Sequence, residues 1–191
     1  MKSVKSCTSS FVGFLGRRLA GLASDQRGVS AVEFAMLLPV MVTLYLGVVE
    51  VSQGVAIDRK VTLTTRTTAD LASRVTSINN ADMTNMLNAT SSVIAPYDES
   101  KVKVVLSAVN IDANGIAKVG WSDTLHGSAR AVGSTVTLPI VLAVPNTTLI
   151  WSEVSYNYNP TFGYVLTGSM NLSDQIYMRP RLSDTITRVN S

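Results

Sequence analysis

An uninterrupted apolar run near the N-terminus limits what this chain can fold into. Residues 34–49, FAMLLPVMVTLYLGVV, contain no charged side chain. As an α-helix they would rise about 24 Å, and the flanking residues 29–32 and 51–57 bring the length past the roughly 30 Å hydrocarbon core of a bilayer. The run starts too late and is too long for an ordinary cleaved secretory signal, and no A-x-A site follows it. The sequence therefore predicts a single membrane-spanning helix.

The charges of the chain predict how this helix crosses the membrane. Residues 1–28 hold one acidic residue, Asp25, and five basic ones, Lys2, Lys5, Arg17, Arg18 and Arg27. Because basic residues stay on the cytoplasmic side, we expect a cytoplasmic N-terminus and a translocated C-terminal body. From totals of 16 basic and 13 acidic residues, the rest of the chain keeps 11 and 12. The sequence pI of about 9.1 is thus a property of the N-terminal segment, and no nucleic-acid partner is predicted.

Glu33 stands at the entrance of the apolar run, immediately before Phe34. A charge at the centre of a bilayer costs about 2.5–3.5 kcal/mol, and less near the interface. Two interpretations of this carboxylate remain open. It can reach back to water at the membrane surface, or it can meet a partner cation inside the membrane.

The stretch around Glu33 carries a family resemblance. Basic residues, Gly28, four further residues, Glu33, an aromatic side chain and an apolar run resemble a type IV prepilin processing site. Residues 27–54, RGVSAVEFAMLLPVMVTLYLGVVEVSQG, are most similar to the TadE/TadG-like pseudopilins of tight-adherence (Flp-type) pili. Near the C-terminus, EVSYNYNPTFG (153–163) and YMRPR (177–181) also look like segments of that family, more loosely.

The resemblance implies a cut by a prepilin peptidase, a membrane aspartyl protease, between Gly28 and Val29. Glu33 and Phe34 would then be the fifth and sixth residues of the mature chain. A glycine before the cut suits a narrow active site, because it lets the backbone extend freely. The new α-amine of Val29 would be a cation able to form a salt bridge with Glu33, in its own chain or in a neighbouring subunit.

The same resemblance implies a non-enzymatic role in pilus assembly. The expected parts are a cytoplasmic leader (residues 1–28), a transmembrane helix (29–50) and a periplasmic α+β domain (51–191) in the bacterial inner membrane. The implied partners are the prepilin peptidase, the major Flp pilin and sister pseudopilins, the inner-membrane pilus assembly platform, and membrane lipid. An alternative of another class is a periplasmic ligand-binding or sensor domain on an uncleaved signal anchor.

Two helices are predicted before the strands begin. Apolar or Thr side chains recur at steps of three and four from Ile57 to Ile78, which indicates that the membrane helix continues as an amphipathic one and ends at Asn79-Asn80. This Thr-rich stripe is only mildly hydrophobic, so it should pack on a sheet without deep burial. Residues 81–95 predict a second short helix that stops at Pro96.

The remaining chain reads as β-structure. Alternating apolar residues predict strands at 101–109 and 116–121 around the turn DANG, and a long strand at 147–158 with Glu153 opposite the apolar face. Residues 122–134 suggest a loop, 134–145 give mixed strand and turn signals, and 173–180 predict a final strand before a polar tail. The expected fold is α+β, with a pilin-like long N-terminal helix packed on an antiparallel sheet.

No catalytic or metal-binding chemistry is predicted. Cys7 is the only cysteine and His126 the only histidine, so neither an intramolecular disulfide nor a histidine-based metal cluster can form. The nucleophile, phosphate-loop and zinc-protease motifs are missing from the sequence. Asp98-Glu99 is expected to be a solvated turn, Arg179 and Arg181 to anchor the last strand, and no cofactor is expected.

Overall fold

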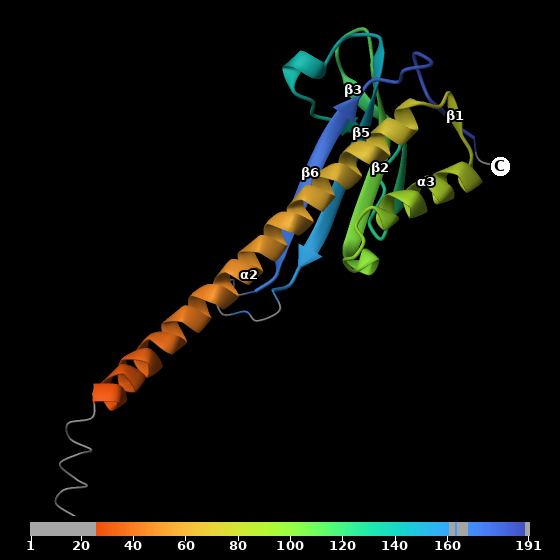
Figure 1. Ribbon diagram of the computed structural model, residues 1–191. Coiled ribbons are helices and arrows are strands. Elements are labelled where there is room, and N and C mark those ends of the chain that lie inside the picture. Colours follow the sequence, from red (N-terminus) through yellow and green to blue (C-terminus); the bar gives the residue numbers. More distant parts are fainter. Residues whose placement is uncertain (1–25, 161–162, 164–167, 190–191) are drawn as a thin grey trace, which may run out of the picture. The chain divides into compact units, whose positions relative to one another are not determined.

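The computed structural model describes residues 26–160, 163 and 168–189 of the chain (Figure 1). Most of the expected leader, residues 1–28, and with it Cys7, lies outside these residues. The chain divides into two compact units, Met1–Gly47 and Val48–Ser191. Helix α2, Gln26–Ser73, belongs to both.

Helix α2 changes character along its length. Its residues from Gly28 to Tyr45 are all exposed, so the described residues of the Met1–Gly47 unit do not bury this apolar stretch. From Glu50 onward one stripe is buried, with a spacing of three and four residues: Glu50, Gly54, Ile57, Val61, Thr64, Thr65, Thr68, Ala69, Ala72 and Ser73. The basic residues Arg59, Arg66 and Arg74 are exposed, on the side of the helix away from this stripe.

The threonines of this stripe are buried more deeply than expected. Thr64, Thr65 and Thr68 are fully buried, so the prediction that the stripe would not bury deeply was wrong. Each hydroxyl donates to the carbonyl four residues back: Thr64 to Lys60 at 2.7 Å, Thr65 to Val61 at 2.8 Å and Thr68 to Thr64 at 2.8 Å. Because the polar atoms are satisfied inside the helix, the methyl groups can pack in a dry interface.

Helix α2 also ends earlier than expected, at Ser73 rather than at Asn79-Asn80. The carbonyl of Ser73 accepts a 2.9 Å hydrogen bond from the backbone N–H of Arg181. A segment far away in sequence thus satisfies a carbonyl that the end of a helix leaves without an internal partner. The chain then leaves the helix and forms strand β1, Ser77–Ile78, in which Ile78 is fully buried.

Helix α3, Asn80–Ser92, confirms the predicted second helix. Asn79 caps it, and its side-chain oxygen accepts from the N–H of Asp82 at 2.8 Å. Met83 and Leu87 are buried. A 3-10 helix, η1 (Glu99–Lys101), follows, capped by the Asp98 side chain, so the acidic pair is a turn as predicted.

Five antiparallel strands form the main sheet in the order β4-β3-β2-β5-β6. They are β2 (Val102–Ile111), β3 (Ala117–Leu125), β4 (Thr135–Val136), β5 (Thr147–Tyr158) and β6 (Met170–Met178). A 3-10 helix, η2 (Ile140–Leu142), lies between β4 and β5. The predicted α+β fold class is confirmed.

The turn residues and the pairing of the two strands determine where β2 and β3 begin and end. The Asp112 carboxylate accepts from the N–H groups of Asn114 and Ile116, and Gly115 has φ +78°, which favours glycine. Strand β3 extends to Leu125, which pairs with Val104. The loop predicted from residue 122 was therefore wrong at its start, because β2 is long enough to pair with the extra residues.

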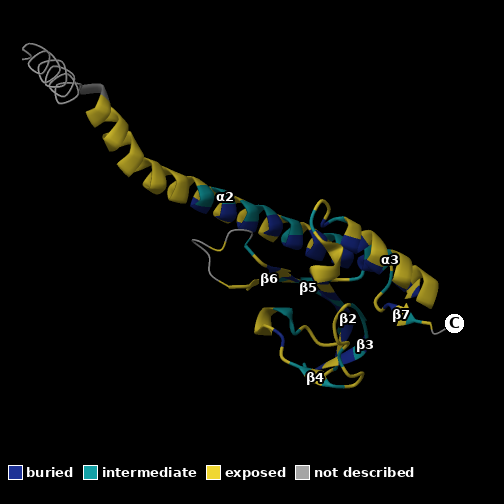
Figure 2. Cartoon of the chain, turned by 90° about the horizontal axis from the view of Figure 1, so that it is seen from below, coloured by how far each residue is buried: buried dark blue, intermediate teal, exposed yellow. Residues whose placement is uncertain are grey.

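The two faces of the sheet are covered differently. Helices α2 and α3 lie on one face (Figure 2). The main core there includes Val61, Leu87, Leu106, Ile150 and Val154. A second, smaller core comprises Val109, Ile111, Ala117, Leu138, Leu149 and Trp151, with Leu142 packed against it. Because side chains alternate along β2 and β5, these strands supply both cores.

The C-terminal segment contains a strand and contacts the rest of the domain, so the prediction of a plain polar tail was wrong. Strand β7, Thr187–Arg188, pairs in parallel with β1. The indole N–H of Trp121 donates to the carbonyl of Ile186 at 2.8 Å. The Arg188 guanidinium donates to both oxygens of Asp123, at 2.9 and 3.2 Å, and this hydrogen bonding raises the pKa of Arg188. Arg181, as predicted for an anchor, forms a 2.9 Å ion pair with Asp70 of α2.

We predict that the buried stripe of α2 carries much of the stability of the Val48–Ser191 unit. Ile57→Ala should lower the free energy of unfolding of a fragment with these bounds by about 2–4 kcal/mol, because it removes buried methyl groups and leaves a cavity. Val55→Ala, two residues earlier on the exposed side, is the matched control and should change it by less than about 0.5 kcal/mol. Urea unfolding followed by circular dichroism measures both. Equal losses would contradict the stripe.

We predict that Arg188 holds the C-terminal segment in place. Arg188→Gln should destabilise the same fragment by about 1.5–3 kcal/mol, since it removes charge-assisted hydrogen bonds from a side chain that is only 13% exposed. Arg181→Gln is the control, because Arg181 is 55% exposed and should cost less than about 1 kcal/mol. Hydrogen exchange of the Thr187 and Val189 amides reports on the segment. Unchanged protection in Arg188→Gln would refute the role.

Candidate functional site

The first part of helix α2 exposes a long apolar run, and very little of this run is buried. The exposed apolar side chains in residues 28–49 include Val32, Met36, Leu37, Val40, Met41, Leu44 and Val48. Water is a poor environment for such a surface, which requires lipid or protein around it. The helix has the length and composition of a single membrane span.

The four residues of the expected processing site lie together at the start of this helix. Gly28 and Val29 occupy its first turns, and Glu33 and Phe34 follow one turn later, all with exposed side chains. A Cβ atom added at Gly28 would meet nothing within 4 Å. The fold of this chain therefore does not require glycine there, and a requirement for it has to come from another molecule.

The positions of Val29 and Glu33 are four residues apart, so they share one face of α2. Side chains of a helix also tilt toward its N-terminus. Glu33 therefore lies on the face of α2 that carries Val29, one helical turn further along the chain.

A second carboxylate of α2, Glu50, has the opposite environment. It is fully buried, and its Oε1 accepts a 2.6 Å hydrogen bond from the backbone N–H of Gly163. Its backbone carbonyl accepts from the hydroxyl of Tyr158 at 3.2 Å. Burial, and after it the charge of Glu50, raises the pKa of Tyr158, so the phenol stays protonated as a donor. Glu50 thereby ties α2 to the end of β5 and to the segment that follows.

From the sequence, Glu50 was noted only within the stretch that resembles the family, and no role was predicted for it. Its burial could have been predicted from its position, because it falls on the same helical stripe as Ile57 and Val61. The stripe of α2 shows that this acid belongs to the core of the domain.

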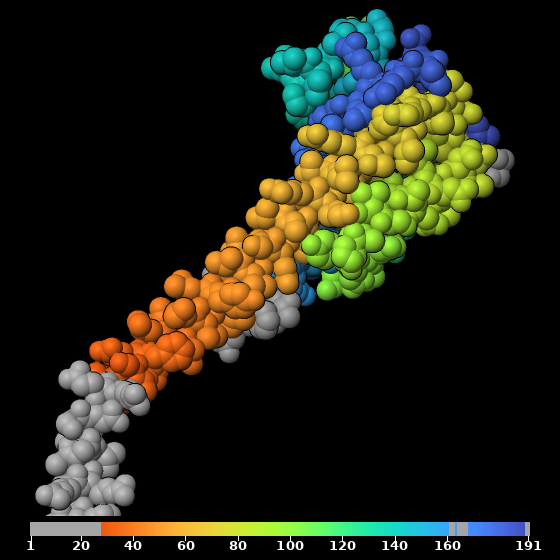
Figure 3. Space-filling model, viewed as in Figure 1, coloured from red at the N-terminus to blue at the C-terminus, as the bar shows by residue number. Residues whose placement is uncertain are grey.

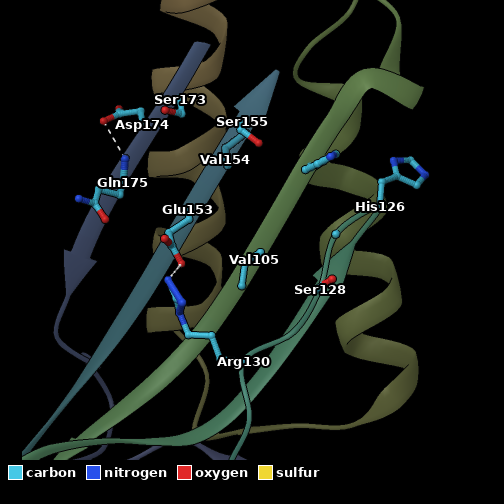
Figure 4. Close-up of a pocket in the computed structure, with 12 residues that line it drawn as sticks. Val105, His126, Ser128, Arg130, Glu153, Val154, Ser155, Ser173, Asp174 and Gln175 are labelled. Carbon is cyan, nitrogen blue, oxygen red and sulfur yellow. Dashed lines mark hydrogen bonds and ion pairs between the residues drawn. The ribbon is translucent and has the colours of Figure 1, made fainter. Parts of the chain in front are cut away.

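The open face of the sheet carries a polar groove of about 710 Å³ (Figure 4). Arg130 reaches over it from the segment after β3 and forms an ion pair with Glu153 of β5 at 2.5 Å. The Arg130 guanidinium also lies 3.8 Å from the ring centre of Trp151, which stacks with Tyr177 at 5.2 Å. The groove is thus lined by an arginine whose charge is already matched within the chain.

The other residues that line the groove are mainly polar. His126 lies at its rim with an exposed side chain, and its Nδ1 is 3.0 Å from the carbonyl of Val102. Ser128, Ser155 and Ser173 line the groove. Among the described residues, no three acidic, histidine or cysteine side chains are grouped so that they could hold a metal ion. The groove could hold a polar ligand by hydrogen bonds.

Comparison with known proteins gives one finding. Residues 28–70 match the family model described as TadE-like protein. No curated protein and no solved structure matches the chain. The matched residues begin at Gly28 and extend along α2 almost to its end at Ser73. The resemblance predicted from the sequence is therefore confirmed for this stretch, which includes Gly28, Val29, Glu33 and Phe34.

Proposed function

We propose that this chain is a TadE-like minor pseudopilin, a structural and assembly component of a tight-adherence (Flp) pilus. The proposal rests on one observation. The TadE-like match starts at Gly28, the residue that precedes the expected cut. From there it extends along an apolar helix whose side chains are exposed as far as Tyr45. Such a helix can anchor the chain in the membrane before assembly and can pack against the helices of other subunits afterwards.

Processing would occur on the cytoplasmic side, where the basic residues hold the leader. Gly28 and Val29 are helical in the uncleaved chain, so the peptidase would have to open the first turns of α2. The first N–H groups of a helix have no internal partners, and glycine is a weak helix former, so this opening costs little. The new chain would begin with the charged amine of Val29.

Glu33 would act in assembly. Two unit charges about 4 Å apart attract by about 4 kcal/mol at an effective dielectric of 20. This is comparable with the roughly 2.5–3.5 kcal/mol cost of placing one such charge at the centre of a membrane. A Val29 amine paired with Glu33 could therefore enter the apolar environment, whereas an unpaired Glu33 could not. The pair would favour subunits that have already been cleaved.

The partners of this proposal are the prepilin peptidase, the major Flp pilin, sister pseudopilins and the inner-membrane assembly platform. The C-terminal α+β domain would lie in the periplasm. The role is structural and requires no enzymatic activity. The alternative of an uncleaved, signal-anchored ligand-binding domain draws on the polar groove around Arg130 and Glu153. The two proposals differ in one readily measured property, the N-terminus of the membrane protein.

We predict that the mature chain begins at Val29 when it is produced together with its own peptidase. Mass spectrometry of the membrane-extracted protein should show this N-terminus. Gly28→Leu should block the cut, and because the position is open in the fold, the variant should still insert and fold. Ala31→Leu adds bulk three residues further on and is the matched control, which should be cleaved. An intact leader in a strain that processes its major pilin would refute the proposal.

We predict that Glu33→Gln leaves cleavage and insertion largely intact but reduces incorporation into pilin complexes. The reason is that glutamine cannot pair with the Val29 amine as an ion. Crosslinking to sister subunits and counts of surface pili measure incorporation, and the mass of the N-terminal peptide controls for cleavage. Glu33→Asp keeps the charge on a shorter arm and should retain more assembly. If Glu33→Gln assembles normally, the carboxylate serves only as a contact with interfacial water.

A further inference from the structure

The segment between β4 and β5 exposes large apolar side chains to solvent, which is unfavourable in an isolated domain. Ile140 and Val141 of the 3-10 helix η2 are 93% and 88% exposed. Val144 and Ile116, from the same segment and from the β2–β3 turn, are also exposed. In Figure 3 the teal residues around position 140 project from the surface of the domain. Neighbouring large apolar residues at such exposure are typical of an interaction surface.

This projection is held by the fold. Leu138 and Leu142, on either side of the exposed pair, pack against the second core. Short backbone hydrogen bonds close the turn, from Leu142 to Pro139 and from Val144 to Leu142, both at 2.8 Å. The N–H of Asn146 donates to the carbonyl of Ile111 at 3.0 Å and ties the segment to the end of β2. Ile140 and Val141 are therefore presented in a defined position at little further entropic cost.

A hollow of about 400 Å³ lies beside the projection. Its lining is mainly apolar or Thr side chains and includes Ile116, Ala117, Val136, Leu138 and Ala143. Ile140 lines it as well, so the projecting element and the hollow share one surface. A surface that offers both a projection and a recess can pair with itself around a two-fold axis, each copy filling the recess of the other.

The charges of this region agree with such a contact. From residue 131 to residue 152 the sequence contains no Asp, Glu, Lys, Arg or His. Two copies of the segment can therefore approach without bringing like charges together and without removing charged groups from water. A partner with a charged surface would have no group of opposite charge to meet within this segment.

We infer that the surface of Ile140, Val141 and the adjoining hollow is a two-fold contact with a second copy of this chain. The contact is independent of the cleavage proposed above, because it involves only residues of the Val48–Ser191 unit. It would hold in the uncleaved chain as well as in the mature one. It would join two C-terminal domains through this segment and edge strand β4, and would leave the other edge strand, β6, and the polar groove free.

Disulfide crosslinking of the full chain in its native membrane tests this inference. In a Cys7→Ser background, Val141→Cys should give a dimer band on mild oxidation with copper phenanthroline. Leu182→Cys is the matched control, because Leu182 is 67% exposed but lies outside this surface. We expect at least about tenfold more dimer from Val141→Cys, as two thiols near a two-fold axis meet far more often than two that collide at random.

A second variant separates a specific contact from chance collisions. Ile140→Asp added to Val141→Cys should reduce the dimer about tenfold or more, since it would place a charge in the apolar contact between the two copies. Leu182→Asp added to Val141→Cys should leave the yield unchanged. A yield from Val141→Cys no higher than that from Leu182→Cys would overturn the inference. So would a crosslinked product that mass spectrometry identifies as another protein, or protection of the Val141→Cys thiol by lipid vesicles alone.

Discussion

The contact between the buried stripe of helix α2 and the sheet is the interaction on which the rest of the domain depends. Without the helix, the apolar face of β2 and β5 would lie in water, and burial of aliphatic side chains contributes about 1.5–3 kcal/mol each. The stripe combines apolar residues with Thr64, Thr65 and Thr68, whose hydroxyls bond back to the helix itself. At its two ends it also receives hydrogen bonds, from Gly163 to Glu50 and from Arg181 to Ser73. The C-terminal part of the chain is thus fastened to the helix at both ends of the stripe.

Sequence patterns were sufficient where one local signal dominated. Strand β5 has the predicted bounds, 147–158, because its alternation is regular and Asn159-Pro160 ends it. The hairpin of β2 and β3 was predicted from the DANG turn, since Asp112 and Gly115 supply the hydrogen bonds and the backbone angle that it needs. The long helix followed from its apolar run and from the spacing that continues through Ile57 and Val61. In each case the residues of the element itself also determine which of its faces packs against the rest of the fold.

The sequence was insufficient where distant segments decide the structure. Strand β7 consists of two residues, Thr187 and Arg188, and its formation depends on β1, more than a hundred residues earlier. The end of α2 at Ser73 depends on the N–H of Arg181, and the length of β3 depends on β2. No local periodicity encodes these contacts. Burial of the threonines was also underestimated, because a hydrophobicity scale counts the hydroxyl and not the internal hydrogen bond that satisfies it.

The two carboxylates of helix α2 lie in different environments, which the sequence alone does not distinguish. Both occupy helical positions next to apolar residues, and both need a partner before they can leave water. For Glu50 the partner lies within the chain, in the backbone N–H of Gly163. For Glu33 the described residues provide no ion pair or hydrogen bond to its side chain, which is exposed. A cut after Gly28 would place a cation one helical turn away, on the side toward which the Glu33 side chain tilts. The Glu33 carboxylate, which has no cationic partner among the described residues of the precursor, would then gain one in the product, and its proposed role depends on cleavage coming first.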